Sequence, residues 1–287
     1  MRSAGYSLSS LTFGAVLVWL GWHAGSANPA APFDRVAMVV LVVVLAVLPL
    51  VLGPVAPNRT ARIVRVAGYV SIYALLVALT GLSRYAGSRF DHFTAFDQAD
   101  WEADMRSGAV ISGMLMIGLI GGYAVAVLRL TSQRMAVEPR TLVIGTGCGL
   151  APALAVYAFM PVGNTSHAFV LAVLPPAALL AAGVLAPRQG VIAGLCAGAT
   201  AALLLATLTI ATMVLLPGQV DLEWANPDPS VPHGTLFELQ MSVSDAAIRY
   251  QLGLLLGPAA GLAIGYLGSS FRRPGRASGR ANAAPAG

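Results

Sequence analysis

The chain has 287 residues, of which 57% are hydrophobic and only 10% are charged, and its mean hydropathy is +0.75. Soluble proteins carry about 25% charged residues, so this composition excludes a soluble globular fold and indicates an integral membrane protein. The net charge of +5 comes from arginines that lie in short segments beside apolar runs. This distribution is typical of membrane orientation rather than of nucleic-acid binding.

Eight apolar stretches are long enough to cross a bilayer as helices, which takes about 17 to 25 residues. They cover residues 8–25, 36–56, 63–83, 108–130, 141–161, 167–186, 190–216 and 248–270. We therefore predict an all-α integral membrane fold, an eight-transmembrane-helix bundle with a small extracytoplasmic β-hairpin between helices 7 and 8. We expect a single polytopic membrane domain over 1–271, with outer loops at 84–107 and 217–247, and a disordered cytoplasmic tail at 272–287.

The first span, residues 8–25, follows Arg2 and ends in the small residues AGSANPAA, so a cleaved signal peptide is an alternative. We favour an uncleaved helix, because its removal leaves seven spans without improving the charge distribution. Trp19 and Trp22 near its outer end are typical of an interfacial anchor.

An even number of spans places both termini on one side of the membrane. That side holds twelve arginines and one acid, Glu138, whereas the other side holds five arginines and eleven acids. Because cytoplasmic segments carry the excess of basic residues, we predict a multi-pass plasma-membrane protein with both termini cytoplasmic. Arg59, Arg62 and Arg65, where the third helix enters the membrane, either anchor this orientation or contact anionic lipid or a cytoplasmic partner.

The first long outer loop contains four neighbouring acids, Asp97, Asp100, Glu102 and Asp104. Thr94 followed by Asp97 resembles a capping box, which predicts that the fourth helix begins outside the membrane. Helical spacing then places Asp97, Asp100 and Asp104 on one face. This acidic face is a candidate site for a cationic ligand, and the alternative is a solvated helix end whose carboxylates favour the helix N-terminus.

Pro175 and Pro176 fall near the middle of the sixth span. Two successive prolines remove backbone donors and clash with the preceding turn, so we expect them to kink or open the helix. An opened helix offers a ligand-binding or gating cavity, and the alternative is a packing kink. The central parts of the eight spans lack Asp, Glu, Arg and His, which argues against a proton relay at the midplane.

Glycine recurs at every fourth position in the last two spans, at Gly190, Gly194 and Gly198 and at Gly253, Gly257, Gly261 and Gly265. In lipid this spacing allows two helices to approach closely. The two helices run in opposite directions at about 1.5 Å per residue. Gly190 therefore shares its depth with Gly265, Gly194 with Gly261, and Gly198 with Gly257. We expect these glycines to be helix-packing residues of one seam, and the alternative is an interface with another protomer or a partner.

Residues 219–243, between these two spans, contain two alternating patterns. Val220, Leu222 and Trp224 alternate with acids, and Phe237, Leu239, Met241 and Val243 alternate with polar residues, so we expect two strands. The proline-rich connection fits a loose hairpin, and Ser244 and Asp245 are expected to cap the eighth helix. The apolar face of this hairpin is a candidate surface for an extracytoplasmic protein or ligand.

All four histidines fall on the outer side, at His23, His92, His167 and His233. They are weak candidates for a zinc or copper site, because no local HxxxH or CxxC spacing supports one. We therefore expect no metal and no cofactor. Cys148 and Cys196 lie within spans, where they are expected to act as small hydrophobic residues.

The chain contains no GxSxG, HExxH or Walker motif, so enzymatic activity stays uncertain and is not favoured. The abundance of glycine and proline in the spans favours a permease-like subunit of a transport assembly. Its partners are then the lipid bilayer and a separate ATPase or other membrane subunit. Two alternatives remain: a membrane sensor or assembly factor that acts through its extracytoplasmic loops, and a membrane enzyme with outer carboxylates and histidines.

Overall fold

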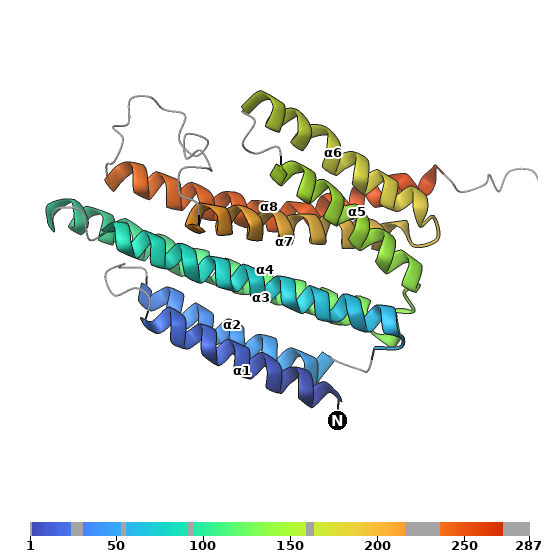
Figure 1. The fold of residues 1–287 in the computed structure, drawn as a ribbon, viewed down its shortest axis with the longest axis horizontal. Helices are drawn as coiled ribbons and strands as arrows, with labels where there is room; N and C mark the ends of the chain where they lie inside the picture. Colours follow the sequence, from blue (N-terminus) through green and yellow to red (C-terminus); the bar gives the residue numbers. More distant parts are fainter. Residues whose placement is uncertain are drawn as a thin grey trace, which may run out of the picture.

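The computed structural model describes residues 2–23, 31–52, 56–90, 95–158, 164–215 and 236–271. Within them the chain forms eight long α-helices and one short 3-10 helix (Figure 1). The α-helices are α1 (Arg2–His23), α2 (Ala31–Leu52), α3 (Arg59–Phe90), α4 (Ala95–Leu130), α5 (Pro139–Ala158), α6 (Asn164–Leu185), α7 (Gly190–Leu215) and α8 (Leu236–Ser270). The 3-10 helix η1 (Gln133–Met135) connects α4 to α5.

Six of these helices contain an apolar segment long enough to cross a membrane, which confirms a multi-pass membrane protein. The segments are Arg35–Leu52, Arg59–Arg84, Val110–Leu130, Pro139–Ala158, Gly190–Thr212 and Tyr250–Ser270. Within the described residues, α1 and α6 contain shorter apolar segments, Ser7–Leu20 and Ala172–Leu185. Helices α3, α4 and α8 have 32, 36 and 35 residues, more than the roughly 20 that cross a bilayer, so they extend beyond it.

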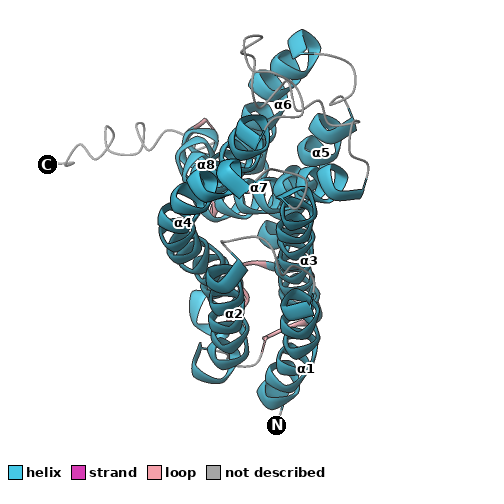
Figure 2. Cartoon of the chain, turned by 90° about the vertical axis from the view of Figure 1, so that its left-hand side faces the viewer, coloured by secondary structure: helices cyan, strands magenta, loops and turns pink. Residues whose placement is uncertain are grey.

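The helices form two halves, α1–α4 and α5–α8. In the first half, α1 contacts α2 and α3, and α4 contacts the same two helices. In the second half, α7 contacts α5, α6 and α8, and α6 also contacts α5 and α8. Contacts of α3 with α5 and α7, and of α4 with α8, join the halves. Figure 2 shows α1 and α2 on the side of the bundle opposite to α5 and α6, with α3 and α4 between them.

Large apolar side chains fill the core of the first half, which extends to α7 and α8. Its fully buried residues include Leu45, Ile72, Leu75, Leu76, Ile120, Leu128, Ile210 and Leu254. The ring of Tyr73 packs edge-on against Phe13, with 5.1 Å between the ring centroids. Its hydroxyl donates a hydrogen bond to the backbone carbonyl of Ser10 at 3.0 Å. Helix α1 is therefore held against α3 by both an aromatic contact and a hydrogen bond.

Small residues allow the backbones of the second half to touch. A methyl group added to Gly145 of α5 would lie 2.7 Å from the carbonyl oxygen of Ala193 in α7. A methyl group added to Gly183 of α6 would overlap the carbonyl oxygen of Gly265 in α8. Because no space is left for a methyl group, the backbones themselves are in contact. Dispersion and Cα–H···O contacts then hold the helices together, since lipid provides no hydrophobic drive between them.

The predicted β-hairpin is wrong over its second strand. Residues 236–243 form the first turns of α8, and Ser244 and Asp245 lie inside this helix rather than at its cap. The segment LFELQM consists mostly of good helix formers, and its alternation also places Phe237 and Met241 four residues apart, as a helix requires. The described residues contain no strand. The first predicted strand and the connection, at 219–235, lie outside the described residues.

Candidate functional site

The predicted acidic face lies on the first turns of α4. This helix begins at Ala95, directly after Thr94. Its backbone places Asp97, Asp100 and Asp104 on one face. Their side chains and that of Glu102 lie outside the described part of the structure, so the cationic-ligand site stays a prediction.

The proline pair does not open its helix. Helix α6 continues from Asn164 to Leu185 through Pro175 and Pro176. Unwinding inside lipid would leave further backbone groups without hydrogen-bond partners, which is costly. The helical conformation is therefore retained through both prolines. Pro176 is exposed and Pro175 is partly buried, next to the exposed Leu174. The pair therefore lies at the surface of α6, which is the outermost helix of the second half (Figure 1).

The histidines lie at the ends of helices or outside the described residues. His23 is the last residue of α1 and His167 is in the first turn of α6, whereas His92 and His233 are not described. Within the described part of the chain, no group of three His, Cys, Asp or Glu residues is placed to hold a metal ion. The absence of a metal site therefore stays a prediction.

The glycines of α7 and α8 lie against one another. A methyl group added to Gly194 would overlap the carbonyl oxygen of Gly261, and one added to Gly198 would overlap that of Gly257. The overlap is reciprocal, since a methyl group on Gly261 would overlap the carbonyl oxygen of Gly194. At these positions a glycine is required by the close approach of two backbones.

The two ends of the glycine rows differ. A methyl group on Gly190 would lie 2.9 Å from the carbonyl oxygen of Gly265, close to where α6 also meets these helices. Gly253, at the other end, has no described atom within 4 Å of an added methyl group. Gly253 is therefore outside the seam, although it shares the four-residue spacing.

A buried amide joins α8 to α4. The side chain of Gln251 is only 8% exposed, and its Nε2 donates to the carbonyl oxygen and to the hydroxyl of Ser112. Within the described residues both hydrogen bonds of Gln251 use the amide nitrogen, which leaves its carbonyl oxygen Oε1 as an acceptor. Both residues lie near the start of their apolar segments, Val110–Leu130 and Tyr250–Ser270.

A second polar contact between the same helices lies deeper in the bundle. The hydroxyl of Tyr123 donates to the backbone carbonyl of Leu254 at 2.8 Å. Leu254 precedes Pro258 by four residues, so its carbonyl lacks the N–H that would normally close this helical turn. Tyr123 therefore supplies the donor that Pro258 cannot, which allows α8 to continue through the proline.

The third polar contact lies at the end of α4. Arg65 of α3 is 5% exposed, and its Nε donates to the hydroxyl of Thr131 at 2.8 Å. Its Nη2 donates to the carbonyl oxygens of Thr131 at 3.0 Å and Leu128 at 3.5 Å. These carbonyls lie at the C-terminal end of α4, which lacks helical donors and carries the negative pole of the helix. Arg65 therefore caps α4, a role that its arginine-rich segment did not reveal.

A buried tyrosine follows Arg65 by one turn of α3. Tyr69 is 7% exposed, and its hydroxyl has no hydrogen-bond partner within the described part of the chain. Arg65, Tyr69 and Tyr73 are spaced by four residues, so they form a polar row along one face of α3. The Tyr69 hydroxyl lies between Arg65 and Tyr73 in this row and carries an O–H donor.

We did not predict the hydrogen bonds between α4 and α8 from the sequence, although Gln251 and Pro258 of α8 each gave a signal. The central parts of the predicted spans lack Asp, Glu, Arg and His, but a buried polar side chain of α8 is an uncharged amide, that of Gln251. Pro258 lacks the N–H that would bond to the carbonyl of Leu254, so the sequence indicates that this carbonyl needs another donor. The donor is Tyr123, which lies 131 residues away in the chain. No spacing rule identifies a partner at that distance in the chain.

Comparison with known proteins yields no match: no family model, no curated protein and no solved structure is similar to this chain.

Proposed function

We propose that this membrane protein is a permease-like subunit of a transport assembly in the plasma membrane, with both termini cytoplasmic. The observation that carries the proposal is the line of buried polar contacts between α4 and α8, from Ser112 and Gln251 to Tyr123 and the carbonyl of Leu254. Polar groups inside a bilayer are costly, and they commonly mark a solute pathway. The amide, hydroxyl and carbonyl groups of this line suit a polar solute.

The different packing of the two halves supports the same proposal. Backbone contacts through glycine join α5–α8, whereas side chains fill the space between the helices of α1–α4. Alternating access in transporters is largely a movement of one rigid unit against another. In this proposal α4 moves against α8, and a solute exchanges hydrogen bonds with the residues of the polar line.

The orientation is tested by thiol labelling from outside intact cells. In a variant whose Cys148 and Cys196 are replaced by alanine, we expect Arg134→Cys to resist an impermeant thiol reagent and Arg84→Cys to react. Arg134 and Arg84 lie near opposite ends of the bundle and are both exposed. Labelling of Arg134→Cys without labelling of Arg84→Cys reverses the orientation.

The pathway is tested by the same reagent at membrane depth. We expect Ser112→Cys to react, because its side chain lies on the polar line. The matched control is Ile111→Cys, the adjacent residue, whose side chain is 67% exposed on the surface of the bundle. A thiol in lipid does not ionise, so the control is expected to stay unlabelled. Equal labelling of both variants, or of neither, contradicts the pathway.

Thiol labelling at Tyr123, the deeper end of the polar line, distinguishes a transporter from a sensor. A transporter exposes Tyr123→Cys to the reagent from each side of the membrane in turn, when it is added to right-side-out and to inside-out vesicles. A sensor with a closed bundle leaves this position unreactive from at least one side. Reaction from only one side under all conditions therefore favours the sensor.

A further inference from the structure

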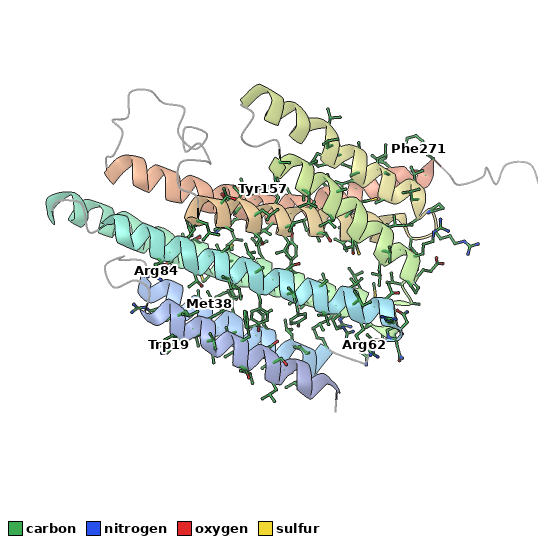
Figure 3. All side chains as sticks on the ribbon, in the orientation of Figure 1. Trp19, Met38, Arg62, Arg84, Tyr157 and Phe271 are labelled. Atoms are coloured by element: carbon green, nitrogen blue, oxygen red, sulfur yellow. The ribbon has the colours of Figure 1, made fainter. Side chains whose placement is uncertain are left out.

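Exposed arginines gather at one end of the bundle, which we name the arginine end. It comprises the start of α3, the segment from the end of α4 to the start of α5, and the loop between α6 and α7. Six arginines are exposed there, at Arg59, Arg62, Arg129, Arg134, Arg140 and Arg188. The exposed acid among the described residues of these segments is Glu138. In Figure 3, Arg62 lies at this end and Arg84 near the opposite end of the same helix.

Two sets of hydrogen bonds hold the segments of the arginine end together. The side chain of Gln189, in the α6–α7 loop, accepts from the backbone N–H of Glu138 at 3.0 Å and donates to the carbonyl of Ala136 at 3.2 Å. Arg65 ties the start of α3 to Thr131, just after α4. The exposed arginines are therefore carried by connected segments and not by independent loops.

Apolar packing beneath the arginines joins the same segments. Ala61 of α3, Val137 of the connection and Leu142 of α5 belong to one buried cluster, which also includes Cys196 of α7. Helices α3 and α5 are in contact. Arg62 and Arg140 are each adjacent or close in sequence to a residue of this cluster, so the packing fixes where their backbones lie.

Exposed apolar residues continue from two of the arginines into the membrane. On α3, Arg62 is followed at four-residue spacing by Val66 and Val70, which are 42% and 62% exposed. On α5, Arg140 is followed on the same side by Val143, Leu150 and Leu154, which are 58%, 44% and 47% exposed. Each stripe thus has a cation at its end and apolar side chains along its length. This pattern matches a molecule with an anionic head and hydrocarbon chains.

We propose that the arginine end binds an anionic phospholipid, with its phosphate at Arg62 and Arg140 and its acyl chains along the apolar stripes of α3 and α5. Guanidinium groups bind phosphate oxygens through paired hydrogen bonds, and clustered cations between membrane helices favour anionic headgroups. A lipid fits better than a free phosphate, because a free phosphate makes no use of the apolar residues. The proposal is independent of the proposed function and of which side the arginine end faces.

The test measures lipid binding to the purified full-length protein in a neutral detergent. Phosphatidylglycerol is expected to bind more tightly than phosphatidylcholine of the same chain length, as measured by native mass spectrometry and by the rise in unfolding temperature. Each basic residue near an anionic surface contributes about fivefold in affinity. Arg62→Gln with Arg140→Gln is therefore expected to weaken phosphatidylglycerol binding by about twenty-five-fold.

Two further variants separate a built site from general charge. Arg84→Gln, which removes an exposed arginine near the other end of α3, is expected to leave the affinity unchanged. Gln189→Ala keeps every charge but releases the loops, and it is expected to weaken binding several-fold. An excess of glycerol 1-phosphate is expected not to displace the lipid.

Three outcomes overturn the proposal. The first is equal binding of phosphatidylglycerol and phosphatidylcholine. The second is that the double variant binds phosphatidylglycerol as tightly as the unaltered protein does. The third is that Arg84→Gln weakens binding as much as the double variant does. Unfolding temperatures without added lipid show whether each variant is folded. If the double variant is unfolded, Arg62→Lys with Arg140→Lys replaces it, with weaker binding expected because lysine cannot form the paired hydrogen bonds.

Discussion

The two halves of the bundle use glycine in different ways. In the first half, methyl groups added to Gly14 and Gly68 meet side-chain atoms of Val42 and Val127. In the second half, methyl groups added to residues such as Gly194 meet backbone oxygens. Valine is stiff in a helix, so at Gly14 and Gly68 the neighbouring side chain still has to shift, but it can do so without moving its backbone. A backbone carbonyl moves only if its whole helix moves. An added methyl group is therefore opposed by one side chain in the first half and by a whole helix in the second.

This contrast follows from what each half buries. Leucine, isoleucine and tyrosine side chains separate the helices of α1–α4 and fill the space between them. Helices α5–α8 present mainly glycine and alanine to one another, so their axes approach until the backbones touch. In lipid both arrangements give dispersion contacts, but only the second depends on the absence of single methyl groups.

The largest expected effect comes from adding one methyl group to the seam between α7 and α8. Gly261→Ala places a methyl group into the backbone of α7 at Gly194, so it is expected to destabilise the protein by about 1 to 3 kcal/mol. Gly253→Ala in the same helix meets no described atom within 4 Å. It is expected to stabilise by up to about 1 kcal/mol through helix propensity alone. Thermal unfolding in one detergent checks both variants, and equal shifts would show that the seam is not tightly packed.

An intermediate effect is expected where the halves meet, at the hydrogen bond from Tyr123 to Leu254. Tyr123→Phe is expected to cost about 1 kcal/mol, because the carbonyl freed by Pro258 loses its donor. Pro258→Ala restores the backbone N–H to that carbonyl, so Tyr123→Phe in this background is expected to cost almost nothing. A double-mutant cycle on unfolding free energies measures the coupling. Additive effects would show that the tyrosine does not compensate for the proline.

The smallest effect is expected for a glycine of the first half, Gly81. A methyl group added there would lie 3.2 Å from Cγ1 of Val214, which must move by only a few tenths of an ångström. The gain in helix propensity offsets this cost, so Gly81→Ala is expected to change stability by less than about 0.5 kcal/mol. If unfolding measurements instead give a loss as large as that of Gly261→Ala, the contrast between the halves disappears.

The sequence by itself determined that the chain folds in a membrane and that its apolar stretches are helices, although six of the eight predicted spans are long enough to cross a bilayer within the described residues. Apolar stretches of bilayer length predict helices because lipid offers no partner to an unpaired backbone group, and this rule needs no tertiary information. The four-residue spacing of glycine and a rise of about 1.5 Å per residue likewise indicated which glycines of α7 and α8 share a depth. The sequence was misleading at 236–243, where alternation of apolar and polar residues fits a strand and the early turns of a helix equally well.

The tertiary structure decided the rotation of each helix and the partner of each buried polar group. Rotation determines that an added methyl group at Gly253 meets no described atom whereas one at Gly261 meets another backbone, although both glycines obey one spacing. It also brings Tyr123 to the carbonyl of Leu254 and Arg65 to the end of α4. These pairs join residues 131 and 66 positions apart. A hydrogen bond needs two groups within about 3 Å, and over such separations that distance is determined by how whole helices pack.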